Sequence, residues 1–145
     1  MAGLRLFNFS QQLLELSMRV RGARHEILSA NSANADTPGY RPRDIDFAAT
    51  MRTAVEMDDT AVGNREQQME RLLTSPLDLQ PIVYEPGMTN NQHGEDRLDG
   101  NGVSLDRQMA LLNENALSYE TSLTLFSRTI TVTDTLLEEV ANLKR

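Results

Sequence analysis

Two carboxylates, Asp44 and Asp46, stand on either side of Ile45 in the segment Arg43-Asp44-Ile45-Asp46-Phe47. Paired carboxylates support general acid–base catalysis when burial or a neighbouring charge shifts the pKa of one of them. Nothing in the surrounding charged sequence would remove either one from water. We therefore expect both side chains to face outward on an extended arm, solvated or in contact with an arginine of a partner, and we expect no catalytic residue.

Other residue types that support chemistry are few. The two histidines, His25 and His93, lack metal-ligand spacing, and the chain has no cysteine. Residues 96–106 resemble a calcium-binding loop only faintly, because Leu98 stands where a side-chain oxygen is required. The run Gly100-Asn101-Gly102 is too short to cradle a phosphate. The sequence therefore predicts no metal site and no cofactor.

The segment from Asn31 to Tyr40 reads as a helix end followed by a turn. Pro38 has a fixed φ and disfavours helix at the residue before it, and Gly39 suits the third position of a type II turn, which needs a positive φ. A helix should therefore end by about residue 36. Asn34 falls in a row of apolar residues, with Asn31 one turn away. Two interpretations stay open: a polar helix end without a partner, or side chains that bond across a helix interface in an assembled state.

The residues before this turn show a heptad pattern. One row recurs every seven residues, and a second follows it by three, as in the a and d positions of a coiled coil. The rows are Leu6, Leu13, Val20, Ile27 and Asn34, and Phe9, Leu16, Ala23 and Ala30. The pattern predicts an amphipathic helix over residues 5–34.

The C-terminal residues repeat this pattern behind Ser104, a favourable N-cap. Four threonines in residues 129–135 lower the helix propensity, but the pattern continues through them, so we expect helix throughout. We expect the two seams to pack against each other and against neighbouring subunits. The C-terminal rows are Leu105, Leu112, Tyr119, Phe126, Thr133 and Val140, and Met109, Ala116, Leu123, Ile130 and Leu137.

The expected fold is mainly α: long N- and C-terminal heptad helices form an elongated coiled-coil or tube-type domain with an irregular, possibly short-β middle. The predicted divisions are residues 1–36, 37–103 and 104–145, the first and last packing as one assembly domain. In the middle we expect helices around Phe47–Val55 and Arg65–Leu73. Prolines allow at most a short edge strand within Leu77–Tyr84, and Glu85–Gly102 reads as a loop.

Bulk properties exclude several classes of protein. The net charge of -7 disfavours nucleic-acid binding, which needs a basic surface. No apolar run reaches the roughly 18 residues of a membrane span, so we expect no direct membrane insertion. The N-terminal residues lack the pattern of a cleaved signal peptide.

Two motifs carry a resemblance to a known family. The motif Ala30-Asn31-x-Ala33-Asn34-x-x-Thr37-Pro38-Gly39-Tyr40 resembles the signature of bacterial flagellar rod, hook and hook-associated proteins. The Arg43–Phe47 arm and Leu98-Asp99-Gly100-Asn101-Gly102-Val103-x-Leu105-Asp106 resemble segments of the flagellar basal body rod proteins. Ser32 departs from the signature, because many relatives carry a larger apolar residue there. The resemblance covers roughly residues 5–50 and 96–140.

This resemblance implies a non-enzymatic structural subunit of the proximal rod, needed for flagellum assembly and motility. It implies a place in the rod where it crosses the periplasm, and export by the flagellar type III apparatus without a cleaved signal peptide. The implied partners are other copies of the chain, FlgC-like rod proteins, a FliE-like adaptor, the MS ring and the export apparatus. The alternatives are another, FlgC-like rod protein, or a soluble coiled-coil adaptor or type III secreted translocator.

We expect the assembly interfaces to draw on the two seams and on the junction between them. The candidate residues are Leu13, Leu16, Val20, Ile27, Asn31, Asn34, Pro38, Gly39, Tyr40, Asp44, Asp46, Phe47, Leu112, Tyr119, Leu123, Phe126, Ile130 and Leu137.

Overall fold

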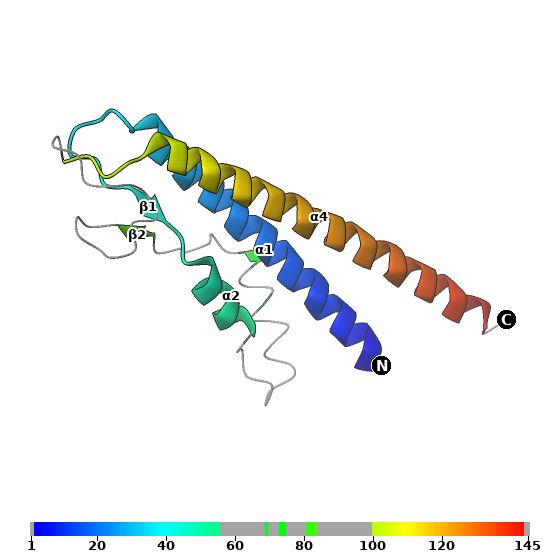
Figure 1. Ribbon diagram of the computed structural model, residues 1–145. Helices are drawn as coiled ribbons and strands as arrows, with labels where there is room; N and C mark the ends of the chain where they lie inside the picture. Colours follow the sequence, from blue (N-terminus) through cyan, green and yellow to red (C-terminus); the bar gives the residue numbers. More distant parts are fainter. Residues whose placement is uncertain (1, 56–68, 70–72, 75–80, 84–99, 144–145) are drawn as a thin grey trace.

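The computed structural model describes residues 2–55, 69, 73–74, 81–83 and 100–143, with side chains from residue 9 onward. The elements are α1 (Ala2–Ala33), β1 (Arg43–Asp44), α2 (Phe47–Val55), β2 (Ile82–Val83) and α4 (Leu105–Asn142). The two long helices α1 and α4 lie side by side and antiparallel, with both chain termini at the same end (Figure 1). The predicted mainly α fold, with long terminal helices and a short β element between them, is confirmed.

The end of α1 has the predicted turn chemistry. The helix ends at Ala33, where the amide of Asn34 still donates to the carbonyl of Ala30 at 3.2 Å. Gly39 has a φ of 70°, and the amide of Tyr40 donates to the carbonyl of Thr37 at 3.2 Å. These features define the type II turn predicted from Pro38 and Gly39. The turn redirects the chain from α1 into the arm.

The C-terminal helix α4 begins directly after Ser104, the predicted N-cap. Ser104 is extended (φ -101°) and its carbonyl accepts the amide of Gln108 at 2.9 Å, but its side chain makes no capping bond. The helix continues through the threonine-rich segment, as predicted. There the hydroxyls of Thr129, Thr131, Thr133 and Thr135 donate to the carbonyl four residues earlier, at 2.8 to 3.1 Å. These bonds satisfy the hydroxyls within the helix.

The apolar row of α1 is buried by the middle of the chain. Leu16 and Val20 form a core cluster with Ile45 of the arm, Ala54 of α2 and Met69. Partly buried apolar residues surround this cluster: Phe9, Leu13, Ala23, Ile27, Phe47, Met51 and Leu73. Among the described residues, this cluster contains no side chain from α4. The core therefore lies on the side of α1 that faces the arm and α2 (Figure 1).

Short elements complete the middle. β1 pairs antiparallel with β2, with Arg43 opposite Val83 and Asp44 opposite Ile82. β2 lies inside the range where a short strand was predicted, whereas β1 lies in the arm, where no strand was predicted. α2 has the predicted bounds. Its N-cap is Asp46, whose Oδ1 accepts the amide of Ala49 at 2.8 Å. Of the helix predicted at 65–73, residues 69 and 73 are described and are helical; the rest, and residues 85–99 of the predicted loop, lie outside the described residues.

No helix in the described ranges is both long and apolar enough to span a bilayer.

Candidate assembly interface

The α4 helix turns a polar row toward α1. Four residues spaced by seven, Asn101 just before the helix and Gln108, Asn115 and Ser122 within it, have exposed fractions of 0%, 0%, 1% and 8%. Half-buried Thr129 continues the row. Each residue from Gln108 onward directly precedes a member of the predicted apolar row, so the two rows are rotated by about 100° around the helix.

The apolar face of α4 consequently points away from α1. Its large side chains are about half exposed: Met109 54%, Tyr119 39%, Leu123 46%, Ile130 39%, Leu137 48% and Val140 50%. Leu112 and Phe126 of the other predicted row are half-buried, so the packing of the two seams against each other stays a prediction. α1 covers its own apolar row with the arm and α2, and the buried residues of α4 are polar.

Hydrogen bonds connect the polar row to α1 at successive levels. Ser17 Oγ and Ser122 Oγ lie 3.4 Å apart, and both side chains are buried. Asn115 Nδ2 donates to the carbonyl of Arg21 at 2.9 Å. Farther along, Gln11 Nε2 donates at 3.4 Å to Oγ1 of Thr133, which lies outside the polar row but on the next turn of α4. Directional bonds at several levels fix the register of the two helices.

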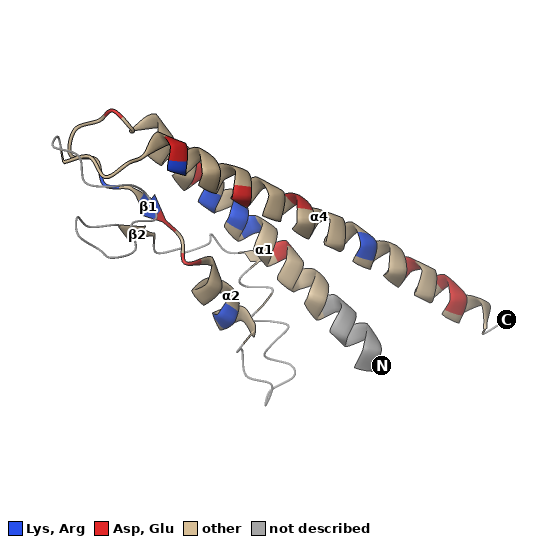
Figure 2. Cartoon of the chain, in the orientation of Figure 1, with Lys and Arg blue, Asp and Glu red and all other residues tan. Residues whose placement is uncertain are grey.

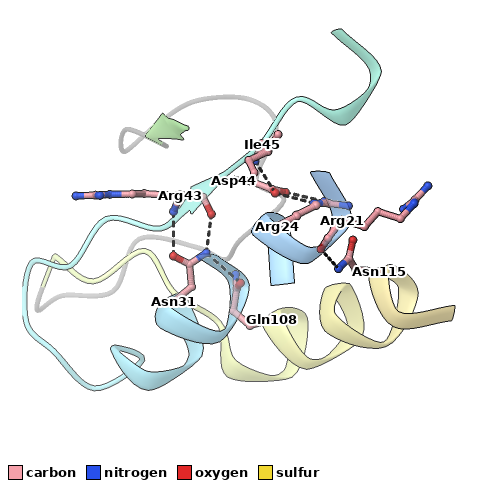
Figure 3. A network of polar contacts seen from close by, with 8 residues as sticks. All are labelled: Arg21, Arg24, Asn31, Arg43, Asp44, Ile45, Gln108 and Asn115. Carbon is pink, nitrogen blue, oxygen red and sulfur yellow. Dashed lines mark hydrogen bonds and ion pairs between the residues drawn. The ribbon is translucent and has the colours of Figure 1, made fainter. Parts of the chain in front are cut away.

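Asn31 joins three parts of the chain (Figure 3). Its Nδ2 donates to the carbonyl of Arg43 at 2.7 Å and to Gln108 Oε1 at 3.2 Å. Its Oδ1 accepts the amide of Arg43 at 3.0 Å and the hydroxyl of Tyr40 at 3.3 Å. The side-chain amide therefore pairs with the arm backbone as a neighbouring strand would, while it also reaches α4. The side chain is fully buried, and all its donor and acceptor capacity is used.

The arm does not leave the helical pair with both carboxylates outward, and that expectation is corrected. Asp44 and Ile45 are buried, at 2% and 5% exposure. Arg24 of α1 binds Asp44 at two points, Nε to Oδ1 at 2.7 Å and Nη2 to Oδ2 at 2.6 Å. The predicted contact of this carboxylate with an arginine therefore exists, but inside the same chain. Of the two carboxylates of the arm, the one that is exposed is Asp46, the N-cap of α2.

Arg21 lies between the core and α4. Its guanidinium carbon sits 4.1 Å from the ring centroid of Phe47. Burial lowers the pKa of Arg21 and the nearby Arg24 lowers it further, whereas Glu114 of α4 raises it. An arginine remains protonated under such a shift. Its Nε and the Oδ1 of Asn115 are buried atoms without a hydrogen-bond partner in the described structure.

Asn101 connects two parts of the chain, and it is not among the candidate residues predicted from the sequence. Its Nδ2 donates to the carbonyls of Asn34, Ala35 and Thr37 at 3.1, 2.8 and 2.8 Å. Its Oδ1 accepts the amide of Val103 at 2.8 Å. One side chain thus closes the turn after α1 onto the segment that starts α4. The available signal was an asparagine between two glycines, directly before a predicted helix start.

The other candidate residues are spread over several environments. Asn34 caps its own helix, with Nδ2 donating to the carbonyl of Ala30 at 2.8 Å, so a bond of this side chain across an interface between subunits stays a prediction. Pro38 and Gly39 are exposed at the turn, and Leu112 and Phe126 of α4 are half-buried. The structure therefore gathers Asn31, Tyr40 and Asp44 around the arm and leaves Tyr119, Leu123, Ile130 and Leu137 on the outer face of α4.

Basic and acidic residues are distributed differently over α1 and α4 (Figure 2). Arginines lie in the middle of α1, near the arm, whereas acidic residues recur along α4 and gather near its end as Asp134, Glu138 and Glu139. Within the described residues, no three His, Asp or Glu side chains are placed to hold a metal ion.

No family model matches the chain, but curated relatives cover most of it. It is 39% identical to the flagellar basal body rod protein FlgB of Salmonella typhimurium over 121 residues, 80% of each chain. It is 36% identical to FlgB of Escherichia coli K12 over 124 residues, 82% of this chain and 83% of the relative. It is 34% identical to FlgB of Proteus mirabilis over 119 residues, 81% of this chain and 82% of the relative. The chain therefore belongs to the family of the flagellar basal body rod protein FlgB.

Proposed function

We propose that this rod protein is a subunit of the proximal rod that is needed for flagellum assembly and motility. As a member of a rod-protein family the chain is a structural protein and not an enzyme. Its proposed partners are further copies of itself, FlgC-like rod proteins, a FliE-like adaptor and the MS ring. We also propose that it reaches the rod through the flagellar export apparatus without a cleaved signal peptide.

The observation that carries the proposal is the outward apolar face of α4. Tyr119, Leu123, Ile130 and Leu137 lie on it at 39% to 48% exposure. Covering a side chain that is about half exposed contributes roughly 1 kcal/mol. Several such side chains on one helix face supply enough free energy to hold a subunit in a lattice, provided that neighbours cover them.

The polar row supports this use of α4. Gln108, Asn115 and Ser122 form the hydrogen bonds of α4 to α1 within one chain. The apolar face of α4 therefore stays available to neighbouring subunits. A helix that buried its apolar row intramolecularly would have little left to contribute to a rod. The arm, held against α1 by Asp44, then lies at a fixed position next to the helical pair.

The test is complementation of a strain that lacks its own copy of the gene. The double variant Leu123→Asp/Ile130→Asp should abolish swimming and rod incorporation, because two charges would be buried at the proposed interface. The purified variant should keep the helical content and thermal stability of the parent, since both side chains lie outside the intramolecular core.

A matched control is Thr124→Asp/Thr131→Asp, on the same two turns of α4, where both threonines are exposed. This control should swim better than the test variant. Normal motility of Leu123→Asp/Ile130→Asp would contradict the proposal. Loss of the helical fold in this variant, at an export level equal to that of the parent, would also contradict it.

A further inference from the structure

The pair Asn101–Gly102 is the one Asn-Gly sequence in the chain. Such pairs are chemically labile, because glycine has no side chain to shield its amide nitrogen. That nitrogen attacks Cγ of the asparagine, a five-membered succinimide forms, and ammonia leaves. Water then opens the ring at one carbonyl or the other, so the product is aspartate or isoaspartate. Overall one ammonia is released and one water is consumed, and water is the only co-reactant. In aspartate the new carboxyl group is on the side chain, whereas in isoaspartate the main chain runs through the former side-chain carbonyl.

The folded junction holds every group that takes part in this reaction. The leaving nitrogen, Nδ2 of Asn101, is engaged by the carbonyls of Asn34, Ala35 and Thr37. The attacking nitrogen of Gly102 donates to the carbonyl of Tyr40 at 3.3 Å. Asn101 has 0% exposure, which keeps the hydrolytic water away. Ring closure would require several of these bonds to break together.

The product would not fit the site that protects the reactant. An aspartate at position 101 is ionised at neutral pH and has no hydrogen to donate, yet it would face three carbonyl oxygens. Those carbonyls belong to the turn at the negative end of the α1 dipole, which further disfavours an anion. Isoaspartate adds a methylene to the main chain between Gly100, whose φ is 73°, and Val103. Either product prevents the close contact between the turn and the start of α4.

We propose that Asn101 is a deamidation site controlled by folding: it reacts while the chain is unfolded and is protected once the turn after α1 closes onto it. Because deamidation is irreversible, a chain that stays unfolded too long loses the ability to close the α1–α4 junction. This inference concerns the chemistry of one residue and does not depend on the role of the chain in the rod.

The first test compares deamidation rates in the full-length protein by peptide mass spectrometry. One sample is kept in urea and one in sucrose, which favours the folded state, with helical content checked by circular dichroism. Modification of Asn101 should be at least about tenfold slower in the folded sample, because it then requires local opening. Asn115, followed by Ala116, is the internal control and should react slowly in both. Equal rates at Asn101 in the two samples would overturn the proposal.

A second test separates the chemistry from the fold. Gly102→Ala should slow the reaction in urea severalfold, because the added methyl group hinders attack by the amide nitrogen. Positive φ is confined to Gly39 and Gly100 among the described glycines, so the substitution requires no left-handed backbone. An unchanged rate in urea would contradict the succinimide route.

A third test addresses the consequence of the modification. Asn101→Asp should lower the midpoint of thermal unfolding at neutral pH and regain part of it in mild acid, where the carboxyl group is protonated and can donate. Asn101→Ala, which removes the donor without adding charge, should lose stability without that recovery. Wild-type stability of Asn101→Asp at neutral pH would show that the product is tolerated, and would contradict the second half of the proposal.

Discussion

Arg24 and Asp44 form a two-point ion pair that fastens the arm to α1, with Nε–Oδ1 and Nη2–Oδ2 distances of 2.7 and 2.6 Å. The exposed fractions of the two side chains are 14% and 3%. The same carboxylate accepts the amide of Ile45 at 2.7 Å, so it also shapes the backbone that leads to the buried Ile45. This pair decides whether the arm lies along the helix or projects from it.

Asp44→Asn should lower the free energy of unfolding by about 3 kcal/mol. That figure is at the lower end of the cost of breaking a buried pair, since Arg24 keeps some contact with water. Urea unfolding followed by circular dichroism measures it. Asp46→Asn is the matched control and should change stability by less than about 0.5 kcal/mol, because asparagine is an equally good N-cap. Equal costs for the two variants would contradict the role of Asp44 in fastening the arm to α1.

Asn31→Leu should be much more damaging than Asn34→Leu. Removal of the Asn31 amide breaks its bonds to the backbone of Arg43 and to the side chain of Gln108, at about 1–3 kcal/mol for each buried bond. Asn34 loses mainly a bond within its own helix end, worth about 1 kcal/mol. Thermal unfolding of both variants gives the comparison. Similar melting temperatures would show that Asn31 does not join the arm, α1 and α4.

The serine pair between the long helices should be replaceable. Ser17→Ala/Ser122→Ala removes both partners of one buried contact, so no unpaired group remains, and the expected change in stability is less than about 1 kcal/mol. Ser122→Ala alone should be more costly than the double variant, because the buried Ser17 hydroxyl then loses its bond across the helices, whereas in Ser17→Ala the Ser122 hydroxyl keeps its bond to the carbonyl of Ser118 at 3.0 Å. A loss of more than about 2 kcal/mol in the free energy of unfolding of the double variant would show that the serine pair is not replaceable.

Substitution of alanine for glycine should change the stability in opposite directions at two positions, Gly39 and Gly22. Gly39 has a φ of 70°, so Gly39→Ala should cost about 1–2 kcal/mol through backbone strain, although the space around it is free. Gly22 lies inside α1, and an added Cβ there would meet no neighbouring atom within 4 Å, so Gly22→Ala should stabilise by about 0.5–1 kcal/mol. Chemical denaturation of both variants is sufficient. Stabilisation by Gly39→Ala would contradict the type II turn.

The heptad pattern was sufficient to predict the two long helices and their approximate bounds. Apolar residues at a spacing of seven specify a helix whatever covers them, and Pro38 and Gly39 specify a turn through their own φ preferences. The pattern was not sufficient to say which face of α4 meets α1. Gln108, Asn115 and Ser122 also recur every seven residues, and nothing local indicates that this polar row closes the chain while the apolar row remains outside.

Polar contacts between residues far apart in the sequence could not be predicted, because local patterns do not identify the partner. The contact of Asn31 with Gln108 joins residues 77 positions apart, and Asn101 reaches carbonyls 64 to 67 positions earlier. Local propensity says only that asparagine suits helix ends and turns. The burial of Asp44 also depended on Arg24, 20 positions away on another element.

The position of the outer face of α4 is measured most directly by maleimide labelling of single-cysteine variants, in which no other residue reacts because the chain has no cysteine of its own. In the free protein Leu123→Cys should label rapidly and Ser122→Cys slowly, since the parent residues are 46% and 8% exposed. In isolated basal bodies both should be protected, because neighbouring subunits then cover the outer face of α4. Rapid labelling of Leu123→Cys in the assembled rod would contradict the account.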